Sequence, residues 1–231
     1  MQVKSIAIPF NRPDVFTIWC FGDLHAGTKH FSESEAKRTI KKIKDDNVAL
    51  NEADYYISLV ESIKDKCLGK IEGNHEITLK YHYHIDVQDY ICKALGVTSL
   101  GYSAFIRMDF RRCGKTEYNI VGFFTHGAGC AITKGAKVNR LERVMDSFSA
   151  DLYAHGHVHD IITNTKSYLY LTDENKIVQK VKVGAMTGCY FRTYSQDVPA
   201  SYGEQKNYPP TAIGSPVFTI YPDKNTLSVE G

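Results

Sequence analysis

Four short clusters of residues that can coordinate a metal ion constrain how this chain folds. The first cluster follows the apolar run 15–21, which predicts a buried strand that ends at Gly22 and Asp23. A strand of this kind places Asp23 at the carboxyl end of a sheet, where open α/β sheets bind their ligands. The clusters are Asp23-Leu24-His25, Gly73-Asn74-His75-Glu76, His126-Gly127 and Gly156-His157-Val158-His159. Their imidazole, carboxylate and amide groups suit Zn²⁺, Mn²⁺, Fe²⁺ or Ni²⁺.

The apolar patterns elsewhere predict a mixed α/β fold. In the first third we expect a strand at 15–21, a helix at 32–43 that begins with a capping box from Ser32 to Glu35, a short strand at 47–50, a helix at 55–63 and a strand at 67–71. This alternation implies a parallel sheet with right-handed crossovers.

From residue 101 onward, strand patterns outnumber helical ones. We expect strands at 102–110, 118–125, 150–155, 167–171, 177–183 and 216–221, and a helix at 137–148. Loops rich in Gly, Pro and Tyr fill 184–215. Because there is no internal repeat and no low-complexity linker, we expect one domain over residues 1–231.

Composition restricts the class of protein. The net charge of +2 gives no general attraction toward nucleic acid, so a polyanionic substrate would need a local basic patch. The six cysteines form no C-x-x-C pair, which favours reduced thiols. The N-terminal residues do not resemble a signal peptide, and no run reaches 18 apolar residues. We therefore expect a cytoplasmic protein that does not bind to a membrane.

The four clusters resemble the calcineurin-like metallophosphoesterase family. The family pattern is D-x-H, G-D-x-x-D/N, G-N-H-D/E, an isolated His, and G-H-x-H. Four of these five blocks are present in this order between residues 23 and 159. The resemblance implies a four-layer α/β/β/α sandwich. It also implies an enzyme that hydrolyses phosphoester bonds with two divalent metal ions, with Mn²⁺ expected first and Zn²⁺, Fe²⁺, Ni²⁺ and Mg²⁺ as alternatives.

The same resemblance assigns roles to the clustered residues. Asp23, His25 and His159 would bind one metal ion, and Asn74, His126 and His157 would bind the other. A metal-bound hydroxide would attack the phosphorus, and His75 would protonate the leaving oxygen as general acid.

Two nearby residues have other expected roles. We expect Glu76 to orient its neighbours rather than bind metal. His155 is expected to pack or hydrogen-bond in the core.

The second block of the family pattern is absent, because no Gly-Asp pair occurs between residues 26 and 72. Three explanations remain open. A loop that carries the block is missing from this version of the chain, or Asp54 or a neighbouring residue replaces its bridging carboxylate, or the site is degenerate. The third explanation leads to the alternative function: a non-catalytic or single-metal binding protein on the same fold.

The expected substrate is a phosphodiester, so nuclease and nucleotide phosphodiesterase activities are the leading predictions. The stretch His126-Gly127-Ala128-Gly129 with Lys134-Gly135 resembles small metallophosphoesterases of phage and prophage origin, which suggests a DNA- or nucleotide-directed role. Basic residues after His126 either contact phosphates or form the solvated face of a helix; they are Lys134, Lys137, Arg140 and Arg143. Loop residues that either line the cleft and stack a base or are purely structural are Arg192, Tyr194, Tyr202 and Tyr208.

Overall fold

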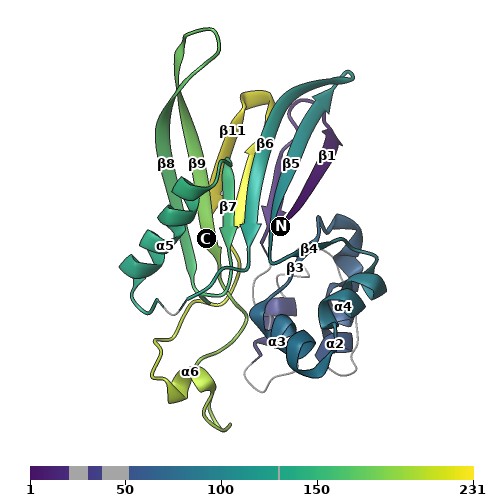
Figure 1. Cartoon of the computed structure of the whole chain (residues 1–231), viewed down its shortest axis with the longest axis vertical. Coiled ribbons are helices and arrows are strands. Elements are labelled where there is room, and N and C mark those ends of the chain that lie inside the picture. The colour runs from purple at the N-terminus through teal and green to yellow at the C-terminus, as the bar shows by residue number, and fades with distance from the viewer. Residues whose placement is uncertain (21–30, 38–51, 130) are drawn as a thin grey trace.

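The fold is mixed α/β, as the sequence predicts, and is built around a six-stranded sheet. The computed structural model describes residues 1–20, 31–37, 52–129 and 131–231 (Figure 1). The strands of the large sheet lie in the order β1 (Gln2–Pro9), β5 (Ser103–Arg112), β6 (Lys115–Thr125), β7 (Leu152–His155), β9 (Ile177–Thr187) and β8 (Ile161–Leu171). Strands β6, β7 and β9 run parallel, whereas β5 and β8 run antiparallel to their neighbours β6 and β9.

A second, three-stranded sheet is formed by segments that are far apart in the sequence. Its order is β11 (Thr226–Glu230), β10 (Val217–Tyr221) and β2 (Phe16–Trp19), and both pairings are antiparallel. The expectation that β2 and the strand near residue 70 share one parallel sheet is therefore wrong. The latter strand, β3 (Lys70–Ile71), pairs in parallel with β4 (Ser99–Gly101) in a separate two-stranded sheet. An apolar pattern indicates that a segment is a strand but does not identify its partner.

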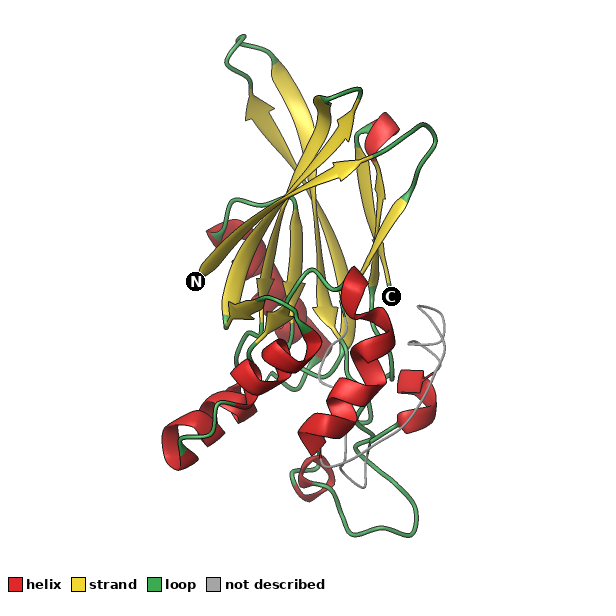
Figure 2. Ribbon diagram, turned by 90° about the vertical axis from the view of Figure 1, so that its right-hand side faces the viewer, coloured by secondary structure: helices red, strands yellow, loops and turns green. Residues whose placement is uncertain are grey.

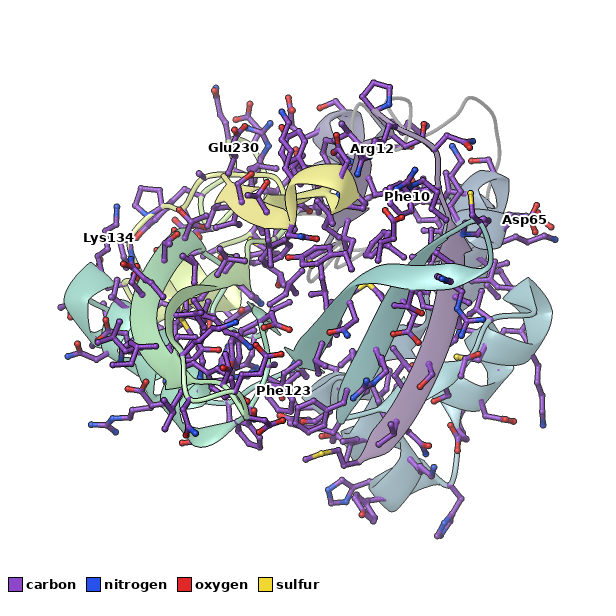
Figure 3. All side chains as sticks on the ribbon, turned by 90° about the horizontal axis from the view of Figure 1, so that it is seen from above. Phe10, Arg12, Asp65, Phe123, Lys134 and Glu230 are labelled. Atoms are coloured by element: carbon purple, nitrogen blue, oxygen red, sulfur yellow. The ribbon has the colours of Figure 1, made fainter. Side chains whose placement is uncertain are left out.

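The main core lies between the two larger sheets. Along β5, alternate residues are buried, as expected for a strand with two different faces. Ala104, Ile106, Met108 and Phe110 pack in one cluster with Phe218 and Ile220 of β10. Figure 3, a view from above, shows side chains filling the space between the sheets.

Helix α5 (Lys134–Ser147) covers the opposite face of the six-stranded sheet. The hydroxyl of Thr133 caps its first turn by accepting from Ala136 N. Leu141 and Met145 are fully buried against Phe123 and Tyr153 of the sheet. Because α5 covers one face and the second sheet covers the other, all four residues of β7 are buried.

The remaining helices gather at the end of the sheets (Figures 1 and 2). They are α2 (Glu52–Val60), a 3-10 helix (Glu61–Lys66), α3 (Asn74–Tyr83), α4 (Val87–Leu95) and the short α6 (Tyr202–Gln205); a second 3-10 helix (Pro222–Lys224) joins β10 to β11. Leu59, Ile91 and Leu95 form a smaller core with Tyr190 from the loop after β9.

Most of the expected elements are present, with adjusted bounds. The strands expected at 102–110, 118–125, 150–155 and 216–221 correspond to β5, β6, β7 and β10, and the helix at 137–148 corresponds to α5. The strands at 167–171 and 177–183 are parts of the longer β8 and β9. Residues 33–37 are helical, whereas the rest of the helix expected at 32–43 and the strand at 47–50 lie outside the described residues. Among the helices described here, none is long and apolar enough to cross a membrane.

Candidate metal and phosphoester site

Asn74 begins helix α3 directly after the short strand β3. The preceding residue, Gly73, has extended backbone angles and lies close to two side chains of the site. A Cβ atom at Gly73 would lie 2.7 Å from Glu76 Oε2 and 3.2 Å from His126 Cε1. Only glycine therefore allows α3 to begin this close to His126.

His126 follows the last residue of β6 and is 9% exposed. Its backbone N–H donates to Tyr102 O at 3.0 Å, and the ring of Tyr102 meets the imidazole edge to face with centroids 5.4 Å apart. The Tyr102 hydroxyl donates to the carbonyl of Gly127. Gly127 has φ +77° and packs against the ring of His155, where a side chain would collide. These contacts hold the imidazole of His126 in one place.

Asn74, His126 and His157 come together from three separate elements. Nε2 of His126 lies 2.8 Å from Asn74 Oδ1 and 3.1 Å from His157 Nδ1. The His126 and His157 rings are 5.1 Å apart at an interplanar angle of 70°. A single proton on His126 Nε2 can serve only one of these contacts in a linear hydrogen bond. The structure thus places an oxygen of Asn74 and a nitrogen of His157 within 3.1 Å of His126 Nε2.

The turn that carries His157 and His159 follows β7 and has an unusual backbone. Both histidines have positive φ, +70° and +53°. The left-handed conformation costs roughly 1–2 kcal/mol for each non-glycine residue. Val158 N donates to Gly156 O at 2.9 Å, which closes the first half of the turn. The protein must therefore stabilise this turn through contacts outside it.

Asp160 anchors the end of this turn. Its side chain accepts from Lys137 Nζ at 2.9 Å, and its carbonyl accepts from Gly188 N at 3.1 Å. The Lys137 residue is 5% exposed, although it lies on helix α5. The buried ion pair connects α5 to the loop that carries the two histidines.

His155 has the role expected for it. It is 3% exposed, and its Nδ1–H donates to Gly156 O at 2.8 Å. Burial lowers the pKa of this imidazole, and the positive charge of Arg140 contributes in the same direction. The prediction that His155 packs and hydrogen-bonds in the core is confirmed.

A cavity of about 490 Å³ lies beside the Asn74–His126–His157 cluster. Asn74, His75, His157 and His159 line it. The loop after β9 and the segment before α5 also contribute to its lining, with Ile132, Phe191, Thr193, Tyr202, Tyr208, Pro209 and Thr211 among the residues. Figure 1 shows α3 and the α6 loop flanking the end of β6 and β7 where this site lies.

Glu76 belongs to a polar network beneath the start of α3. Lys70 Nζ donates to Glu76 Oε1 at 3.1 Å and to Gln88 Oε1 at 2.7 Å, and Gln88 in turn donates to Lys70 O. Burial alone would raise the pKa of Glu76, but the charge of Lys70 and the hydrogen bonds outweigh it, so the net shift is downward. Glu76 is therefore held as a carboxylate that fixes β3 to α3.

The structure describes five of the seven residues named as metal ligands or general acid. It brings Asn74, His126 and His157 into contact and places His75 and His159 on the same cavity. The other two, Asp23 and His25, lie outside the described residues. So do Asp45 and Asp46, which are candidates besides Asp54 for the missing bridging carboxylate. Asp54 lies on α2, where its carboxylate accepts from the Tyr90 hydroxyl of α4, and it does not line the cavity.

The donor set of the cluster fits a divalent cation. Two ligands that each lie about 2.1 Å from an ion at right angles are about 3 Å apart, close to the two distances that join His126 Nε2 to Asn74 Oδ1 and to His157 Nδ1. An amide oxygen and two imidazoles are suitable ligands for Mn²⁺ or Zn²⁺. Within the described ranges no group of three His, Cys, Asp or Glu side chains is placed to hold a metal. The third donor of this cluster is an asparagine.

The sequence analysis did not identify Lys137 and Asp160 as a pair that anchors the site. The signal was present, because Lys137 lies one turn before Leu141 on the buried side of α5. The other basic residues of the helix differ: Lys134 and Arg143 are exposed, whereas Arg140 donates to the carbonyl of Ala128. The four basic residues thus form neither one phosphate-binding row nor one solvated face.

Comparison with known proteins gave no match: no protein-family model, no curated protein and no solved structure is similar to this chain at a significant level.

Proposed function

We propose that this protein is a metal-dependent phosphoesterase that hydrolyses phosphodiesters. The observation that carries the proposal is the convergence of Asn74 Oδ1, His126 Nε2 and His157 Nδ1, at 2.8 and 3.1 Å, beside a cavity of substrate size. Asn74 and His157 lie 52 and 31 positions from His126 in the sequence, and both contact its Nε2, in the combination that the family resemblance requires for one metal ion.

The residues of the cluster would hold one divalent ion, with Mn²⁺ the first candidate. A second ion would need Asp23 and His25 together with His159, which lines the same cavity. Such ions supply Lewis acidity and a nucleophile at neutral pH. We also propose that the two stacked sheets and α5 belong to a full four-layer α/β/β/α sandwich. The proposal further includes a single domain and a cytoplasmic location.

The chain's own residues support the reaction in distinct ways. His75, on the exposed first turn of α3, faces the cavity and would donate a proton to the leaving oxygen. Tyr202 reaches His159 Nδ1 with its hydroxyl at 3.3 Å and orients that imidazole. Lys137 fixes the turn that carries His157 and His159.

A second candidate function is binding of a single metal ion without catalysis. The observation that favours it is the position of Asp54, which pairs with Tyr90 on α4 rather than lining the cavity. Without a bridging carboxylate, two cations would repel each other with less compensation. Turnover separates the two candidates.

The test uses two diesters and the full chain loaded with Mn²⁺. Wild type is expected to hydrolyse both bis-p-nitrophenyl phosphate and a dinucleoside monophosphate. His75→Ala should lower the rate for the dinucleoside by about 10²–10⁴-fold, because an alkoxide leaving group needs the proton. The rate for bis-p-nitrophenyl phosphate should change much less, because p-nitrophenolate leaves without protonation.

His82→Ala, on the same helix and about 10 Å further along it, is the matched control. No turnover of either diester with any of Mn²⁺, Zn²⁺, Fe²⁺, Ni²⁺ or Mg²⁺ would reject the enzymatic proposal.

A further inference from the structure

We infer that the cavity binds a nucleoside phosphate of mononucleotide size and that Tyr202 stacks on its base. This inference rests on the proposed function, because it places the phosphate at the histidine side of the same cavity. It goes further by naming the chemical class of the substrate and the residue that recognises it.

The first argument is the polarity of the cavity wall. The lining combines Asn74, His75, His157 and His159 with aromatic and apolar residues of the loop after β9. In the part of the chain that the structure describes, no carboxylate lines this cavity. A ligand that joins an anionic group to a flat, apolar one matches both kinds of lining.

The second argument is the state of the aromatic wall. Tyr202 is 47% exposed, and its ring stacks on buried Phe191 with centroids 5.3 Å apart and an interplanar angle of 25°. Phe191 also lies against His159, with centroids 6.1 Å apart. The aromatic pair therefore lies directly beside His159 in the lining of the cavity.

The third argument is that internal hydrogen bonds hold the aromatic part of the lining in place. Ser201 caps the short helix α6 by accepting from Glu204 N at 3.0 Å, and its hydroxyl donates to Thr193 O at 2.6 Å. Further along the loop, the Tyr194 hydroxyl donates to Tyr208 O at 2.9 Å. These bonds fix the loop that carries Tyr202 and Tyr208, so less ordering entropy opposes binding.

Size and charge favour a mononucleotide over a nucleic acid strand. The cavity volume of about 490 Å³ is in the range of small-molecule sites. Lys137, the one basic side chain of the described chain that lines it besides the histidines, is already paired with Asp160. A strand would need a row of cations along its backbone, and the net charge of the whole chain is only +2.

The test measures binding of AMP and of ribose 5-phosphate to the full chain by calorimetry, without added metal and again with Ca²⁺. The two ligands share sugar and phosphate, so the ratio of their dissociation constants reports the base alone. We expect AMP to bind about tenfold more tightly. The measurement of this ratio requires no turnover. The predicted preference for AMP can therefore be absent in a protein that hydrolyses phosphodiesters, and it can be present in a protein that does not.

Two variants of Tyr202 separate the ring from the hydroxyl. Tyr202→Phe and Tyr202→Leu both lose the hydroxyl that contacts His159, but only Phe keeps a flat ring. The tenfold ratio should persist in the Phe variant and fall to about one in the Leu variant. Equal affinities of AMP and ribose 5-phosphate for wild type would overturn the inference. A single-stranded oligonucleotide that binds more than tenfold tighter than AMP would overturn it in favour of nucleic acid.

Discussion

The ammonium of Lys137 and the carboxylate of Asp160 form a buried ion pair, 2.9 Å long, between helix α5 and the turn that presents His157 and His159. The side chains are 6% and 24% exposed, so water screens the pair weakly. Since both histidines have positive φ, the turn needs external support. The ion pair provides that support at the residue directly after His159.

Removal of the Lys137 charge is therefore expected to affect stability and the site together. Lys137→Met would leave Asp160 without its cation and should lower the free energy of unfolding by about 2–3 kcal/mol. Metal affinity should fall as well, because the turn that carries the histidines loses its anchor. Denaturant unfolding and metal titration measure the two effects.

The exposed Lys134 on the same helix provides the control, and Lys134→Met should change stability by no more than about 0.5 kcal/mol. In a double-mutant cycle with Asp160→Asn, the coupling energy should be about 1–3 kcal/mol. A coupling near zero would mean that the ion pair does not stabilise the turn.

Gly73→Ala tests the close approach of α3 to His126. A Cβ atom there meets Glu76 Oε2 at 2.7 Å and His126 Cε1 at 3.2 Å, so both side chains must shift. We expect metal affinity to fall by about tenfold or more, with a loss of about 1–3 kcal/mol in stability.

The matched change is Gly135→Ala on α5, where a Cβ meets no atom within 4 Å. That variant should be more stable than wild type by about 0.5–1 kcal/mol, because alanine favours the helix. Equal metal affinity of Gly73→Ala and wild type would show that the spacing at the start of α3 does not matter.

The cysteines should differ widely in reactivity. Burial raises the pKa of the Cys20 thiol to about 12, so almost no thiolate is present at pH 8. Cys113 is exposed in the turn between β5 and β6. Iodoacetamide labelling at pH 8, followed by peptide mass spectrometry, should modify Cys113 in the native protein and Cys20 only after denaturation.

Cys67 provides a comparison within the same experiment. The residue as a whole is exposed, but its thiol is partly buried. This burial raises the pKa of the thiol, although a backbone hydrogen bond with Gly69 acts to lower it. We therefore expect Cys67 to be labelled more slowly than Cys113. Labelling of Cys20 as fast as Cys113 would contradict the packing of Cys20 between the two sheets.

The sequence was most informative where local pattern and structure coincide. The alternation of 102–110 and the apolar spacing of α5 are properties of single segments, and β5 and α5 form as predicted. The contacts of His126 with Asn74 and His157 were expected only from the family resemblance, because they join segments that are 52 and 31 positions apart. The pairing of β2 with β10 was not predictable, since it joins residues about 200 positions apart.

Helices α3 and α4 had no counterpart in the sequence analysis, for different reasons. Helix α3 has mostly exposed side chains and no apolar stripe, so its residues carry no helical period. Helix α4 did carry signals, with Asp86 as its N-cap and Gly96 in the left-handed conformation at its end. The burial of Lys137 depends on Asp160 and is a tertiary property.

Metal content tests the central claim most directly. Wild type, prepared without chelator, reloaded with Mn²⁺ and desalted, is measured by mass spectrometry beside His126→Ala and the control His82→Ala. We expect at least one ion per chain in wild type and in His82→Ala, and close to two if a bridging ligand completes the site. His126→Ala should lose the ion that Asn74 and His157 share with it. No bound metal in wild type, or equal metal in wild type and His126→Ala, would contradict the account.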